Sequence, residues 1–157
     1  MKSQKGTESV GLTVALQCVT EAMSVPSLQD FQQWLDRSFP DVDDLSVLIR
    51  VVDASESQQL NRDYRSKDKP TNVLSFPFEV PAGVPNTHLG DLVICAEVVN
   101  REALEQGKSP RAHWAHISIH GVLHLMGFDH LDPADAEEME AIEVRLLKQL
   151  GISDPYH

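Results

Sequence analysis

Three histidines lie close together in the run H-G-V-L-H-L-M-G-F-D-H, which extends from His120 to His130. His120 and His124 are four residues apart, so on a helix their side chains project from the same face and can reach one metal ion. Gly127 can adopt the left-handed conformation that ends a helix and turns the chain. We therefore expect His130 to supply a third ligand from outside the helix.

Three neutral imidazoles suit zinc, and three protein ligands with one open position are typical of a catalytic zinc. Imidazole also binds nickel, copper and iron, so zinc is a hypothesis. His113 and His116 lie on nearly the same stripe of the helix, and spacing alone also allows a pair of His116 with His120. The glycine turn followed by His130 favours the three-ligand set. We predict that His113 and His116 pack in the core, with His116 a candidate to orient a ligand.

The spacing of these histidines and of Gly127 matches the metal motif of the metzincin proteases, H-E-x-x-H-x-x-G-x-x-H. Gly121 occupies the position where those proteases have a glutamate that takes a proton from the zinc-bound water. Glycine has no group that can transfer a proton. A protease is therefore disfavoured, and the rest of the chemistry must come from elsewhere in the chain.

The remaining sequence predicts a mixed α/β (α+β) fold in a single domain over residues 1–157. Strands are expected at 11–20, 45–53, 72–76 and 90–95, giving about four strands in a mixed sheet. The short helix expected between the second and third strands favours a parallel pair, and one edge strand is expected to run antiparallel.

Helices are expected after Ser27, at 55–65 and at 96–106. Ser109-Pro110 and Asp132-Pro133 each combine an N-cap with proline at the first helical position. The first of these begins the histidine helix, which we expect to pack on one face of the sheet. In the last helix an apolar stripe is predicted to face the core and the charged residues to face solvent. That stripe comprises Met139, Ile142, Leu146 and Leu150.

The formal net charge of −11 argues against a general nucleic-acid binder, which needs lysine and arginine near phosphates. Residues 59–76 nevertheless carry a net charge of +2. On charge alone this segment is an ordinary solvated turn. Cys18 and Cys95 are isolated, as expected of free thiols in a reducing compartment. Neither a secretory signal nor a run of about 18 apolar residues is apparent, so we expect a cytoplasmic protein without membrane contact.

Three segments together resemble the YbeY family of bacterial metal-dependent endoribonucleases. They are Y-R-S-K-D-K-P-T-N-V-L-S-F-P-F from Tyr64, L-G-D-L-V-I-C from Leu89, and the histidine run. The resemblance implies cleavage of single-stranded RNA in ribosomal RNA processing, especially at the 3′ end of the small-subunit RNA, and a part in ribosome quality control. It implies one zinc ion per chain, and the small ribosomal subunit or its assembly factors as partners. It also implies His120, His124 and His130 as ligands and Arg65 as the functional arginine.

The residues themselves support part of this interpretation. A guanidinium near the metal would stabilise the negative charge that a phosphodiester gathers in the transition state, and Arg65 is the best candidate. Arg62, Lys67 and Lys69 would hold flanking phosphates. By motif the nearest carboxylates are Asp91 and Asp129, which we expect to orient histidines rather than to move protons.

Two questions stay open at this point. Either water or the RNA 2′-hydroxyl could attack the phosphate. The chief alternative function is a non-catalytic, zinc-bearing ribosome-assembly factor, and a metalloprotease is less favoured because of Gly121.

Overall fold

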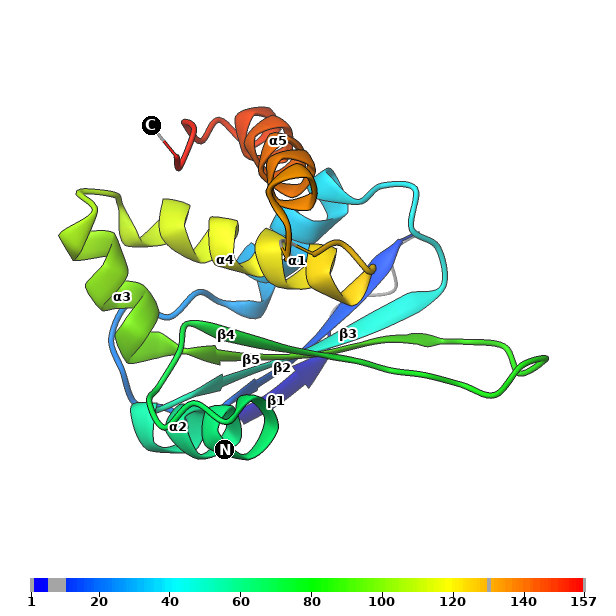
Figure 1. Ribbon diagram of the computed structural model, residues 1–157, viewed down its shortest axis with the longest axis horizontal. Coiled ribbons are helices and arrows are strands. Elements are labelled where there is room, and N and C mark those ends of the chain that lie inside the picture. Colours follow the sequence, from blue (N-terminus) through cyan, green and yellow to red (C-terminus); the bar gives the residue numbers. More distant parts are fainter. Residues whose placement is uncertain (1, 6–10, 130, 157) are drawn as a thin grey trace.

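A computed structural model describes residues 2–5, 11–129 and 131–156, and Figure 1 shows its arrangement. Five strands form one sheet in the order β1-β2-β3-β5-β4. The strands β2, β3 and β5 run parallel, whereas β1 and β4 are antiparallel edge strands. Their bounds are β1 Lys2–Lys5, β2 Leu12–Cys18, β3 Leu45–Val52, β4 Val73–Pro77 and β5 His88–Cys95. The predicted mixed α/β class is confirmed.

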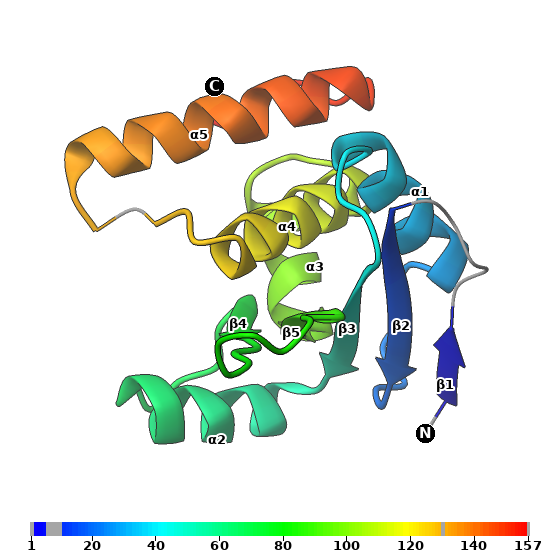
Figure 2. The ribbon, with the colours of Figure 1, turned by 90° about the vertical axis from the view of Figure 1, so that its right-hand side faces the viewer.

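Helices cover both faces of this sheet. In Figure 2, α1 and α4 lie on one face, α5 lies outside α4, and α2 lies on the opposite face. The helix bounds are α1 Leu28–Ser38, α2 Ala54–Arg65, α3 Ala96–Glu105, α4 Pro110–Leu125 and α5 Pro133–Gln149. Among the described residues, no helix combines the length and apolar character needed to cross a membrane.

The sheet differs from the prediction at two places. Strand β1 was not expected, because its sequence K-S-Q-K has no apolar alternation. The strands predicted at 45–53 and 72–76, which correspond to β3 and β4, were expected to pair parallel. That prediction is wrong, since β3 pairs with β5. The strands β4 and β5 are consecutive and pair antiparallel as a hairpin, so β5 takes the place beside β3 and β4 becomes the edge. The expected antiparallel edge strand is thus confirmed.

Two apolar clusters lie on opposite faces of the sheet. The larger one joins the sheet to α1, α4 and α5, and it includes Val73 of β4. The smaller one includes Leu74 of β4, against which Leu60 of α2 packs. Because successive side chains of a strand point to opposite faces, these neighbours show that α4 and α2 lie on opposite sides of β4.

The histidine helix approaches the sheet closely at two glycines. A Cβ atom at Gly121 would lie 2.9 Å from Cδ2 of Leu92, and one at Gly90 would lie 2.7 Å from Cδ2 of Leu125 in α4 and 2.6 Å from the carbonyl oxygen of Phe76 in β4. The hydroxyl of Ser75 in β4 also donates to the carbonyl oxygen of Gly121, at 3.1 Å. Position 121 therefore faces the sheet, where the glutamate of the protease motif would have no room.

Candidate metal centre

The ends of α4 fix the positions of its histidines. The hydroxyl of Ser109 accepts a hydrogen bond from the backbone N–H of Ala112, and Pro110 is the first helical residue. At the other end Gly127 has a φ of +98°, and its N–H donates to the carbonyl of His124 at 3.0 Å. The N–H of Phe128 donates to the carbonyl of Leu123 at 3.1 Å, which completes a Schellman motif. The predicted helix start and the glycine turn are confirmed.

The side chains of His120 and His124 converge at their Nε2 atoms. Their Nε2 atoms are 3.1 Å apart, and the rings lie edge to face. Zinc–nitrogen bonds of about 2.0–2.1 Å in a tetrahedral site place two ligand atoms about 3.3 Å apart. The two Nε2 atoms therefore fit adjacent corners of such a site. His130, the expected third ligand, lies outside the described residues, so its role stays a prediction.

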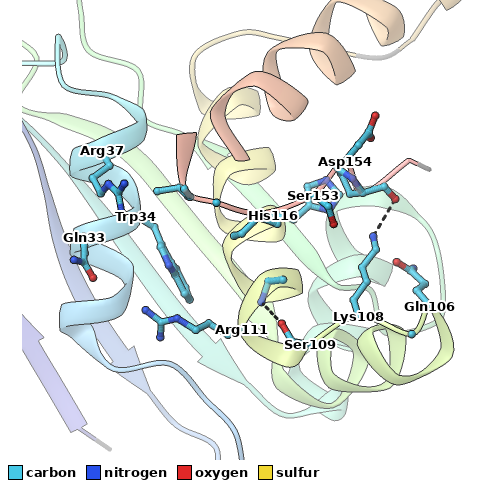
Figure 3. Close-up of a pocket in the computed structure, with 16 residues that line it drawn as sticks. Gln33, Trp34, Arg37, Gln106, Lys108, Ser109, Arg111, His116, Ser153 and Asp154 are labelled. Carbon is cyan, nitrogen blue, oxygen red and sulfur yellow. Dashed lines mark hydrogen bonds between the residues drawn. The ribbon is translucent and has the colours of Figure 1, made fainter. Parts of the chain in front are cut away.

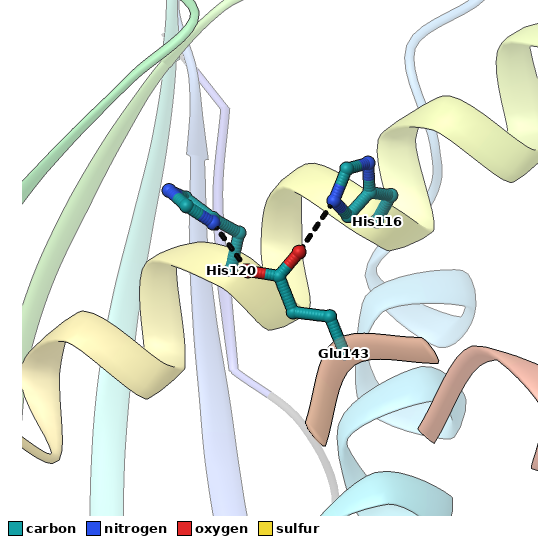
Figure 4. Close-up of side chains that lie close together, drawn as sticks. All are labelled: His116, His120 and Glu143. Atoms are coloured by element: carbon teal, nitrogen blue, oxygen red, sulfur yellow. Dashed lines mark hydrogen bonds and ion pairs between the residues drawn. The ribbon is translucent and has the colours of Figure 1, made fainter. Parts of the chain in front are cut away.

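A buried carboxylate lies behind these histidines. Glu143 of α5 is fully buried, and one of its oxygens lies 2.6 Å from Nδ1 of His120. Its other oxygen lies 2.7 Å from Nε2 of His116 and accepts a hydrogen bond from the hydroxyl of Tyr156. Figure 4 shows the carboxylate between the two rings. The expectation that the charges of the last helix face solvent is wrong at this residue.

Hydrogen bonding sets the charge states in this cluster. Burial alone would raise the pKa of Glu143, but hydrogen bonds from His116 and His120 lower it to about 2. Burial lowers the pKa of His116, although its bond to Glu143 opposes that shift. At neutral pH the carboxylate is thus ionised and His116 is neutral. A neutral His120 that donates from Nδ1 to this carboxylate keeps the Nε2 lone pair for a metal.

The same cluster offers a second possible ligand set. His116, His120 and Glu143 could hold a metal ion, because one potential ligand atom from each lies within 4.8 Å of the others. In this set His120 would bind through Nδ1, the ring nitrogen that faces Glu143, and not through Nε2, which faces His124. The observed N···O distances of 2.6 and 2.7 Å are those of charge-assisted hydrogen bonds.

His113 is packed in the core, one helical turn before this cluster. It is 3 % exposed, and its Nε2 donates to Glu102 of α3 at 3.0 Å. Burial opposes the ionisation of Glu102, but hydrogen bonds from His113 and Asn72 hold its pKa below the ordinary value. The prediction that His113 is a packing residue is consistent with this environment.

Several cavities border α4. One, of about 330 Å³, is lined by His113, His116, His120 and Tyr156 among others, and so reaches His120 of the proposed ligands. Another, of about 600 Å³, lies between α1, the turn before α4 and the C-terminal segment. Figure 3 shows His116, Lys108 and Arg111 among the side chains that line this cavity.

The basic residues predicted to act with the metal lie on the other side of β4. Arg65 is the last residue of α2 and is exposed, and Lys67 and Lys69 follow it in an exposed turn. Arg62 lies 3.8 Å from each of Asp63 and Asp68. No contact between these cations and the histidines is found among the described residues. The cations come from α2 and the turn after it, on the face of the sheet opposite α4 and beside the edge strand β4.

The two aspartates named as candidate orienting groups have different surroundings. Asp91 of β5 accepts a hydrogen bond from Nε2 of His88 at 2.7 Å, and Nδ1 of His88 lies 2.7 Å from the hydroxyl of Ser46. Asp129 is exposed and lies in the turn after α4. The carboxylate that contacts His120 through a short hydrogen bond is instead Glu143.

Comparison with known proteins identifies the family. The family model described as Endoribonuclease YbeY matches residues 17–151. The chain belongs to the YbeY endoribonuclease family. It is also similar in structure to TM1509 from Thermotoga maritima, known from a solution structure, with a TM-score of 0.60 and 25% sequence identity. That similarity covers 86% of this chain and 88% of the other.

Membership of the YbeY family supports an endoribonuclease role in ribosomal RNA processing, which means hydrolase chemistry on RNA phosphodiesters.

Glu143 was not predicted as a site residue, although the sequence of this YbeY-family chain carries a signal for it. Glu143 lies four residues from both Met139 and Leu147, which are buried. A carboxylate on the apolar stripe of a helix must find a buried partner, and the histidine helix supplies two.

Proposed function

We propose that this chain is a zinc-dependent endoribonuclease specific for single-stranded RNA. It acts in the cytoplasm as a single domain, in the maturation of the 3′ end of small-subunit ribosomal RNA and in ribosome quality control. Its partners are ribosomal RNA and the small ribosomal subunit or its assembly factors. The observation that carries the metal-dependent part of this proposal is the 3.1 Å approach of the Nε2 atoms of His120 and His124.

The zinc ligands in this proposal are His120, His124 and His130. The alternative set, which replaces the last two with His116 and Glu143, is less favoured on geometry. Ligand atoms of a tetrahedral zinc site are about 3.3 Å apart, whereas the carboxylate lies 2.6–2.7 Å from both histidines. Glu143 is therefore assigned to hold the tautomer and orientation of His120, with His116 as a second donor to the carboxylate.

When bound, zinc supplies Lewis-acid chemistry that activates water and polarises a phosphoryl oxygen. The chain supplies the geometry. His120 and His124 bring their Nε2 atoms to within 3.1 Å of each other on a helix that is held against the sheet at Gly121. The side chain of His120 is 22% exposed, so one side of the site stays open to RNA.

Arg65 is proposed to contact the scissile phosphate and to stabilise the charge that develops there. A guanidinium offers two parallel donors to a phosphate, which a lysine cannot do. Among the described residues Arg65 has no ion pair of its own that would have to be broken. Arg62, Lys67 and Lys69 would hold neighbouring phosphates, and Asp91 and Asp129 remain candidates for orienting groups in the site.

The test compares metal content and RNA cleavage in the same preparations. We expect His124→Ala to lose zinc and cleavage together, and Arg65→Ala to keep zinc but to lose at least tenfold in cleavage rate. Arg101→Ala is the matched control, since Arg101 is an exposed arginine on α3 paired only loosely with Glu105 at 3.8 Å. Cleavage of single-stranded RNA by Arg65→Ala at the wild-type rate would show that this arginine has no catalytic role.

A further inference from the structure

Two large aromatic side chains are exposed beside the basic turn. Tyr64, in the last turn of α2, is 68 % exposed, and Phe78, directly after β4, is 50 % exposed. Burial of either ring against the protein would stabilise the fold through the hydrophobic effect. Their exposure therefore indicates a role in binding. Both belong to the segment that connects α2 to the edge of the sheet.

These rings belong to a row of four, which we call the aromatic row: Tyr64, Phe76, Phe78 and His88. Tyr64 packs edge to face on Phe76 with ring centroids 5.2 Å apart, and Phe78 packs in the same way on His88 at 5.5 Å. Phe76 and Phe78 are two residues apart, and the N–H of Phe78 continues the ladder by donating to Leu89 at 3.1 Å. Their side chains therefore lie on the same face of the strand.

Positive charge lies next to the aromatic row. The side chains of Arg65, Lys67 and Lys69 have no ion pair or hydrogen bond within the described part of the chain. Of the acids nearby, Asp63 and Asp68 flank Arg62 and Asp91 binds His88, whereas Glu79, directly after Phe78, is exposed. In a chain of net charge −11, three unpaired cations beside exposed rings form a local surface suited to a polyanion with flat aromatic groups.

We propose that the aromatic row and these three cations form a platform for single-stranded RNA, on which bases stack against Tyr64 and Phe78 while the cations contact phosphates. The inference rests on the proposed endoribonuclease function and deepens it. Stacking on an aromatic side chain requires an unpaired base, because the bases of a duplex are stacked on one another. The platform thus accounts for a preference for single strands without reading a sequence.

The position of the platform also fits the proposed site. The row runs along β4 on the face that α2 covers, and the candidate metal ligands lie on α4 across the same edge strand. Figure 2 shows α2 and α4 on either side of β4. An RNA strand held on the platform can continue across this edge toward His120 and His124.

The experiment measures binding in the absence of cleavage. Full-length protein stripped of metal with EDTA is titrated into a short fluorescein-labelled single-stranded RNA and into the same RNA with abasic residues. We expect Tyr64→Ala and Phe78→Ala each to weaken binding of the intact RNA about tenfold. Tyr64→Phe keeps the ring and should bind as wild type. Leu104→Ala, which removes a side chain 83% exposed on α3, is the control for losing an exposed apolar group.

The abasic RNA shows whether base stacking causes the weaker binding of the alanine variants. Without bases to stack, wild type and both alanine variants should bind it equally, with only the electrostatic contribution left. Equal weakening of both alanine variants on intact and abasic RNA would overturn the stacking proposal, as would alanine variants that bind intact RNA like wild type. Either result leaves the endoribonuclease proposal standing. Wild-type protein that binds neither RNA would overturn the platform proposal, whereas the endoribonuclease proposal would be overturned by zinc-loaded protein that does not cleave single-stranded RNA.

Discussion

Replacing Glu143 with glutamine tests how the candidate metal centre is held. The carboxylate accepts three hydrogen bonds, from His116, His120 and Tyr156, in a fully buried position. A glutamine has one acceptor oxygen, so its NH₂ group must face one of the two histidines. Where it faces His120, Nδ1 becomes the acceptor and the proton moves to Nε2, which can no longer bind a metal.

The expected magnitude follows from this exchange. Substituting a group that orients a metal-binding histidine typically costs 10- to 100-fold in metal affinity. Loss of one hydrogen bond to a charged group costs roughly 1.5–3 kcal/mol, so the metal-free Glu143→Gln protein should lose about 2 kcal/mol in free energy of unfolding. Glu137→Gln, an exposed position on the same helix, should change neither quantity appreciably.

Zinc affinity is measured by competition with a chelating dye, and stability by denaturant unfolding of EDTA-treated protein. Wild-type zinc affinity in Glu143→Gln would refute the orienting role. A loss as complete as that of His124→Ala would instead make Glu143 a ligand. His116→Gln separates the cases further: it should lower zinc affinity less than tenfold if Glu143 only orients His120, but should abolish binding if His116 is itself a ligand.

Three further predictions concern the support of the site. Gly121→Ala should destabilise the protein by about 1–3 kcal/mol, because the added methyl group overlaps the flexible end of Leu92; thermal unfolding measures this. Gly90→Ala should cost more than Gly121→Ala, since its Cβ meets a backbone carbonyl that cannot move aside, and the reverse order would contradict the packing described. Glu102 has a lowered pKa in the folded state, so its stabilising contribution is present above its unfolded pKa of about 4.5 and is lost as pH falls below that value. The difference in unfolding free energy between wild type and Glu102→Gln should therefore shrink between pH 6 and pH 3, and a difference independent of pH would count against an ionised Glu102.

Local sequence signals predicted the histidine helix well. Its N-cap, its proline and its glycine each act through a short-range backbone rule, so Ser109, Pro110 and Gly127 could be interpreted without the rest of the chain. The four-residue spacing of His120 and His124 predicted their convergence for the same reason.

Long-range pairings were harder to predict. The place of β5 between β3 and β4 depends on which strands meet in space, and no local pattern encodes it. Glu143 was missed because it was grouped with the charges of an acidic helix, although its place on the apolar stripe pointed to burial. Only the packing of α5 on α4 brings it to His120.

The structure of the zinc-loaded protein, with the metal located by anomalous scattering, tests the central claim most directly. The account predicts a zinc peak within about 2.1 Å of the Nε2 atoms of both His120 and His124, with the Glu143 carboxylate still hydrogen-bonded to Nδ1 of His120. A peak bound to the Glu143 carboxylate and to His116, on the other side of the His120 ring, would contradict it.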